Sequence, residues 1–121
     1  LACSLGDFID QTDRNKMRNE PVVVDGVRFA SKKEARRWAE LQLLERAGEI
    51  TSLVRQHRIE IIVNGIKVTT AIVDFRYVEE GVGTVLEDVK GRTNDRSPNT
   101  QLWKLKFALI KALYGMEVRI T

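Results

Sequence analysis

The chain has 121 residues, of which 43% are hydrophobic and 31% are charged, and its formal net charge is +3. This length fits one domain with a single core, and the composition is ordinary for a globular protein. No apolar run approaches the roughly 20 residues that a membrane helix needs, so no membrane partner is expected. The single cysteine, Cys3, excludes an internal disulfide framework and favours a reducing, intracellular setting.

The first half of the chain predicts a short hairpin followed by a helix. Residues 1–20 are polar and form an N-terminal arm or a short helix before a domain that spans residues 21–121. Apolar runs on either side of Asp25-Gly26 predict a hairpin over residues 22–29. A helix is expected from Ser31 to Ala47, because Ser31 and Glu34 form a capping-box pattern and Gly48 follows as a left-handed stop.

The second half predicts three strands, a helix and a last strand. Residues 53–63 and 66–77 flank Asn64-Gly65, a strong hairpin signal, and residues 84–90 form the next strand after a loop. Residues 91–99 are a polar loop that leads into a helix, which begins near Ser97-Pro98 and ends at Gly115, before a strand over residues 116–120. A helical crossover favours parallel pairing of that last strand. We therefore predict an α/β fold, with a mixed central sheet flanked by helices.

Two of the predicted strands each carry a carboxylate among apolar residues. If the turn between them centres on Gly81, Asp88 lies opposite Asp74, with Cβ atoms about 4.5–5.5 Å apart. Two carboxylates this close repel unless a proton or a cation lies between them, and Mg²⁺ is a cation that carboxylates commonly hold. A slip of one residue would place Glu87 opposite Asp74 instead. We prefer Asp88, because it shares a strand face with Lys90.

Lys90 suits a role beside a metal ion. An ammonium group there can orient a water molecule or stabilise charge on an attacked phosphate. The alternative is that Asp74, Asp88 and Lys90 are edge-strand charges that form a surface ion pair.

These residues resemble the PD-(D/E)xK nuclease superfamily, and most closely small phage and prophage proteins related to junction-resolving endonucleases. The resemblance runs from about residue 22 to the end and is carried by residues 24–29, 31–35, 71–77 and 87–91. It implies a restriction-endonuclease-like core in the order helix, three strands, helix, strand, which is the order predicted above.

The resemblance also implies roles for individual residues. Glu34 matches the acid of the first helix, a metal ligand or organiser, although it can also simply cap that helix. Asp74, Asp88 and Lys90 match the catalytic motif, and the backbone carbonyl of Val89 matches a further ligand of Mg²⁺ or Mn²⁺. Val73 replaces the motif's proline, and Glu87 beside Asp88 leaves open which of the two carboxylates binds metal.

Basic residues surround these motifs and suggest a polyanionic partner. The candidate DNA contacts are Lys32, Lys33, Arg36, Gln56, Arg92, Arg96, Lys104 and Lys111. The alternative for the basic residues is a solvated helix face. Trp38 and Trp103 occupy apolar helix positions, so we expect them to pack in the core.

The resulting hypothesis is a metal-dependent DNA endonuclease that acts on branched or Holliday-junction DNA in phage recombination or replication. The resemblance implies a homodimer in the cytoplasm of a bacterial or phage-infected cell. The alternatives are a non-catalytic DNA-binding or assembly module that keeps the fold, and an end-cleaving subunit of a transposase.

Overall fold

The computed structural model describes residues 20–91 and 93–121. The arm or short helix expected at the N-terminus, Glu20 excepted, and the candidate contact Arg92 lie outside the described residues. The elements are β1 (Val22–Val24), β2 (Val27–Phe29), α2 (Lys32–Arg46), β3 (Ile50–Val63), β4 (Ile66–Glu79), β5 (Gly83–Asp88), α3 (Pro98–Tyr114) and β6 (Val118–Ile120). This order confirms the predicted α/β class and the succession of helix, three strands, helix and strand.

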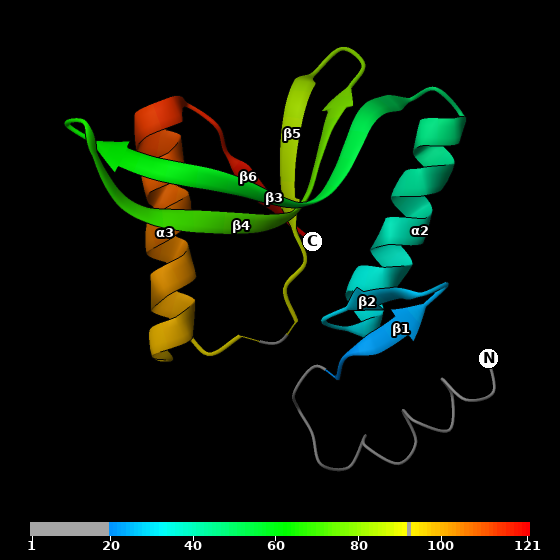
Figure 1. The fold of residues 1–121 in the computed structure, drawn as a ribbon, viewed down its shortest axis with the longest axis horizontal. Coiled ribbons are helices and arrows are strands. Elements are labelled where there is room, and N and C mark those ends of the chain that lie inside the picture. Colours follow the sequence, from blue (N-terminus) through cyan, green and yellow to red (C-terminus); the bar gives the residue numbers. More distant parts are fainter. Residues whose placement is uncertain (1–19, 92) are drawn as a thin grey trace.

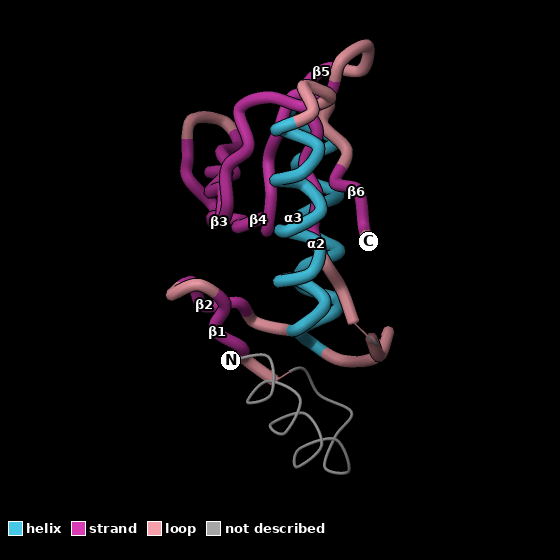
Figure 2. The backbone as a smooth tube through the Cα atoms, turned by 90° about the vertical axis from the view of Figure 1, so that its right-hand side faces the viewer, coloured by secondary structure: helices cyan, strands magenta, loops and turns pink. Residues whose placement is uncertain are grey.

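The central sheet has the strand order β3-β4-β5-β6, and β1 pairs separately with β2. The first three strands are antiparallel, and β6 pairs with β5 in parallel, as the helical crossover predicted. Figure 1 shows the sheet between α2 and α3, with both helices beginning at the lower end of the molecule. The tube view in Figure 2, turned by 90°, shows both helices upright, one behind the other. Neither helix has the length and apolar character of a membrane-spanning segment, as far as residues 20–91 and 93–121 show.

Several strand boundaries differ from the prediction, and the smaller differences are that β5 begins at Gly83 rather than residue 84 and β6 at Val118 rather than residue 116. β3 begins at Ile50 rather than residue 53, and β4 continues to Glu79 rather than residue 77. The extra pairing crosses a register shift between Thr51 and Val54, and such an irregularity breaks the alternation from which a strand is recognised. β5 ends at Asp88, although the Lys90 N–H still donates to the carbonyl of Thr121.

The core consists of two apolar clusters, each beneath one helix. The first surrounds Ile110 of α3 and contains Ile61, Ala71, Val73, Leu86 and Val118. The second surrounds Leu41 of α2 and contains Ile50, Phe75, Tyr77 and Val85. Trp38 stacks on Phe75 with ring centroids 5.9 Å apart, which confirms its expected place in the core. Together the clusters hold β4 and β5 firmly between the two helices.

Candidate active site

The pairing of β4 with β5 brings Asp74 and Asp88 together. Phe75 pairs with Glu87 and Arg76 with Leu86, the register predicted from a turn centred on Gly81. At the next position the N–H of Asp74 donates to Oδ1 of Asp88 at 3.1 Å. Oδ2 of Asp74 in turn accepts the Val89 N–H at 2.8 Å. The two carboxyl groups are thus neighbours at the end of β5.

Glu34 approaches the same place from α2. Ser31 caps this helix, and its Oγ accepts the N–H of Glu34 at 3.1 Å, as the capping pattern predicted. The Glu34 carboxylate accepts the N–H of Ala30 at 3.3 Å, and only 3% of the residue is exposed. Its second oxygen lies 3.4 Å from Nε2 of Gln56, which is also 3.4 Å from Oδ1 of Asp74. Glu34 therefore has both a capping role and a place beside the sheet carboxylates.

Gln56 has an unusual backbone for a residue within a strand. Its φ of 52° lies in the left-handed region, which non-glycine residues seldom adopt. Its neighbours Arg55 and His57 pair with Phe75 and Val73, so Gln56 lies level with Asp74. The distorted residue thus presents its amide where the carboxylates of α2 and β4 meet.

Lys90 completes the group. Its Nζ lies 2.8 Å from Oδ2 of Asp88 and 4.6 Å from the centroid of the Trp103 ring. The carbonyl of Lys90 accepts a hydrogen bond from Nζ of Lys33 at 2.8 Å, which ties the end of β5 to the first turn of α2. Trp103 was expected in the core, but it is half-buried at the surface of the site, because its position on α3 turns it toward Lys90.

Glu34, Asp74, Asp88 and Lys90 line one cleft of about 480 Å³, and Gln56 lies outside its lining. The lining of the cleft comes from the start of α2, from β4, from the end of β5 and from the loop and first turns of α3; both helices begin at the lower end of the molecule in Figure 1. One wall carries Glu34, Asp74, Asp88, Val89 and Lys90, and the other carries Asn94, Ser97, Asn99, Thr100 and Trp103. The volume is typical of a site for a small ligand or a part of a larger one.

Two carboxyl groups in the cleft, those of Asp74 and Glu34, have raised pKa values. Burial, and then the charge of Asp88, raise the pKa of Asp74 to about 7, although the Val89 N–H opposes the shift. Burial also raises the pKa of Glu34, against the effects of the Ala30 N–H and the Arg55 guanidinium. Negative charge is therefore crowded here, and a bound cation would relieve it.

The donor chemistry of the cleft fits a hard divalent cation, because its carboxylates offer oxygen ligands. In the described part of the chain, no three His, Cys, Asp or Glu side chains stand ready as a metal-binding group. Asp74 and Asp88 are turned instead toward backbone N–H groups and toward Lys90. Binding of an ion would require these side chains to rotate.

Glu87 lies outside the cleft, on the other face of β5. It is fully buried, and Arg37 donates to it through Nε at 2.6 Å and Nη2 at 3.1 Å. Tyr77 and Thr121 donate through their hydroxyl groups at 2.6 and 3.2 Å. Burial alone would raise the pKa of Glu87, but the hydrogen bonds from Arg37 and Tyr77 outweigh it and hold that pKa below its usual value. Of the two adjacent acids, Asp88 is the one that lines the cleft.

Sequence reasoning missed two arginines, Arg37 and Arg55. The guanidinium group of Arg55 lies over the ring of Phe29, with 4.5 Å to the centroid, and Nη2 is 4.0 Å from Oε2 of Glu34. Its Nε is buried without a hydrogen-bond partner among the described residues. A buried glutamate needs a cationic partner, and this requirement could have pointed to an arginine. The amino-acid sequence, however, does not say which arginine supplies the charge.

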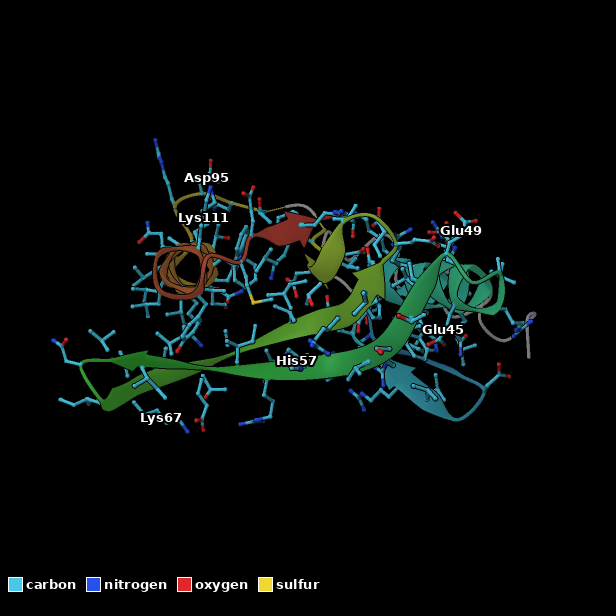
Figure 3. The ribbon with its side chains drawn as sticks, turned by 90° about the horizontal axis from the view of Figure 1, so that it is seen from above. Glu45, Glu49, His57, Lys67, Asp95 and Lys111 are labelled. Carbon is cyan, nitrogen blue, oxygen red and sulfur yellow. The ribbon has the colours of Figure 1, made fainter. Side chains whose placement is uncertain are left out.

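The candidate DNA contacts are spread unevenly. Lys32, Lys33 and Arg36 are exposed at the beginning of α2, and Arg96 is exposed in the loop before α3. Lys104 pairs with Asp95 at 2.9 Å, and Lys111 pairs with Glu117 at 3.2 Å. Asp95 and Lys111 are labelled close together in Figure 3 because that view runs along α3, but Asp95 lies in the loop before the helix begins and Lys111 lies in its last turn. Lys111 therefore lies away from the cleft.

A family model described as a protein of unknown function, DUF1064, matches residues 14–119 of the chain. Comparison with curated proteins and with solved structures found no match.

Proposed function

The chain belongs to the DUF1064 family, and we propose that this member is a metal-dependent endonuclease that hydrolyses DNA phosphodiester bonds. The observation that carries the proposal is the single cleft that contains Glu34 from α2, Asp74 from β4, and Asp88 with Lys90 at the end of β5. Acidic groups with an adjacent amine suit phosphoryl chemistry better than they suit a surface ion pair. The resemblance to the PD-(D/E)xK superfamily adds support.

Glu34, Asp74, Asp88 and the carbonyl of Val89 would hold Mg²⁺ or Mn²⁺. When bound, the ion supplies neutralisation of phosphate charge and activation of a water molecule. The Lys90 ammonium donates hydrogen bonds toward the attacked phosphate or the attacking water, which favours the transition state. Gln56 orients the carboxylates of Glu34 and Asp74 through its amide.

DNA is the proposed substrate, because exposed cations border the cleft while its floor is acidic. Lys32, Lys33 and Arg36 are exposed in the first turns of α2, the helix that carries Glu34, and Arg96 is exposed in the loop before α3, from which Asn94 and Ser97 line the cleft. Such an arrangement attracts a phosphate backbone and still reserves the acidic centre for a metal ion. The resemblance to resolving enzymes points to branched DNA and to a homodimer.

Cleavage of a Holliday junction, a flap, a single strand and a duplex tests this proposal, with Mg²⁺, Mn²⁺ or a chelator present. We expect metal-dependent cleavage, strongest on branched DNA, and its loss in Asp74→Asn and Lys90→Ala proteins. Undiminished cleavage by either variant would contradict the assignment. DNA binding without cleavage under every condition would favour the non-catalytic module. Cleavage only with a partner protein would favour the transposase-type subunit.

A further inference from the structure

We propose that Trp103 is a positioning residue, which holds the Lys90 ammonium group in the cleft by a cation–π contact. This inference rests on the proposed nuclease function for its consequence, but the contact itself can be tested without any cleavage. Trp103 lies on α3, beyond the loop that follows Lys90, and from the sequence it was expected in the core.

The geometry places Lys90 against an aromatic pair. Its Nζ is 4.6 Å from the ring centroid of Trp103 and 5.8 Å from that of Phe107. The two rings are tilted by 49° with centroids 5.4 Å apart, so Phe107 supports the indole from the same helix. Tryptophan is the aromatic side chain that attracts a cation most strongly, and a distance within about 6 Å of the centroid is effective.

The contact with Trp103 would hold Lys90 in place when Asp88 binds a metal ion. Oδ2 of Asp88 is the charged partner of Lys90 at 2.8 Å, yet Asp88 is also a proposed metal ligand. If its oxygens turn to a metal ion, Lys90 loses this partner at the moment when its position matters. The Trp103 ring cannot ligate a metal, so it keeps holding the ammonium group.

Hydrogen bonds hold the backbone of Lys90 in place, so only the conformation of its side chain needs a further restraint. Its N–H donates to the carbonyl of Thr121 at 3.1 Å, and its carbonyl accepts from Nζ of Lys33 at 2.8 Å. Beyond the Cα atom, however, a lysine has a flexible four-carbon stem. The indole limits that freedom on the α3 side of the cleft.

The first test is NMR spectroscopy of the metal-free protein. The ring current of an indole shields protons above its face, so the Lys90 ε-CH₂ protons should resonate upfield of the other lysines. The displacement should vanish in Trp103→Leu, persist in part in Trp103→Phe, and stay unchanged in Leu105→Ala, a matched change at an exposed leucine of α3. An unshifted Lys90 signal in the unmodified protein overturns the proposal.

The second test is kinetic. Trp103→Leu should lower kcat about tenfold with little change in KM, the effect of losing one partly desolvated cation–π contact, and Trp103→Phe should recover most of the rate. In a Lys90→Ala background, where only the residual rate in long incubations with excess protein is compared, the same change should have no further effect, because the cycle isolates the pair. An equal loss in both backgrounds, or a change confined to KM, overturns the positioning role. If the unmodified protein cleaves nothing, the proposed function fails, while the NMR test still decides whether the contact exists.

Discussion

Glu87 and Asp88 are adjacent in β5, yet their carboxylates lie on opposite faces of the strand. Glu87 accepts hydrogen bonds from Arg37, Tyr77 and Thr121, whereas Asp88 faces Lys90 in the cleft. One acid therefore secures the strand against α2 and the C-terminal residues, and the other is available for chemistry. The two should respond differently to the same loss of charge.

Glu87→Gln should lower the free energy of unfolding by about 2–4 kcal/mol, because it leaves the Arg37 charge poorly paired beside a buried site. Urea denaturation near neutral pH measures this change. At temperatures where the variant is folded, its cleavage of DNA should remain close to that of the unmodified protein, since Glu87 does not line the cleft.

Asp88→Asn should show the reverse pattern. The amide oxygen can still accept the Asp74 N–H, and one charge leaves a crowded group, so stability should change by less than about 1 kcal/mol. Cleavage should be lost. If Glu87→Gln abolishes cleavage in a folded protein while Asp88→Asn does not, the assignment of the two carboxylates is wrong.

The raised pKa of Asp74 predicts how the stability of the metal-free protein depends on pH. Between the ordinary value of 3.8 and the folded value of about 7, the folded chain keeps a proton that the unfolded chain has released. The contribution of Asp74 to stability therefore falls as pH rises through this window and is level above it. Asp74→Asn lacks this titration, so its stability relative to the unmodified protein should rise between these two pH values.

Denaturant unfolding of both proteins at several pH values measures that difference. Excess Mg²⁺ should reduce it above pH 7 by stabilising only the unmodified protein, because the ion replaces the proton at the carboxylates. A difference that does not vary with pH would contradict the proposed crowding of charge.

Gln56 should lower the stability of the fold while it supports metal binding. Gln56→Gly relieves a left-handed backbone and should leave the free energy of unfolding within about 1 kcal/mol of its original value or raise it. The amide that lies near Glu34 and Asp74 is lost, so affinity for Mg²⁺ should fall about tenfold, as is common for residues that orient metal ligands. Unfolding and metal titrations on one preparation compare the two effects. Unchanged metal affinity would show that the strained residue does not serve the site.

The salt dependence of DNA binding should separate the basic residues by position. Lys32→Ala and Arg36→Ala, in the first turns of α2, should each reduce the slope of log affinity against log salt by about 0.7 on single-stranded DNA. Lys111→Ala is the matched control, because Lys111 lies toward the far end of α3 and pairs with Glu117. Fluorescence anisotropy at several salt concentrations gives the slopes. An equal effect of all three changes would mean that DNA does not approach through the cleft.

The relation between Asp74 and Asp88 could be predicted from the sequence for a simple physical reason. Side chains in strands alternate strictly, and the turn around Gly81 sets the register of the two strands that it joins. Both are local properties, so the pairing and the face shared by Asp88 and Lys90 could be read without knowledge of the rest of the chain.

The partners of Glu87 and the position of Trp103 could not be predicted in this way. A buried glutamate needs a cation, but only the packing of α2 on the sheet selects Arg37. The apolar residues of α3 are spread over most sides of the helix, and two of them, Leu102 and Leu105, are 50% and 57% exposed. Periodicity therefore cannot tell which ring on that helix faces Lys90.

Titration of the protein with Mn²⁺, followed by calorimetry with and without single-stranded DNA, tests the central claim most directly. The account predicts one or two ions bound per chain, more tightly with DNA present, and loss of this binding in Asp88→Asn but not in Glu87→Gln. Equal binding by Asp88→Asn and the unmodified protein, or no binding even with DNA, would contradict a metal centre in this cleft.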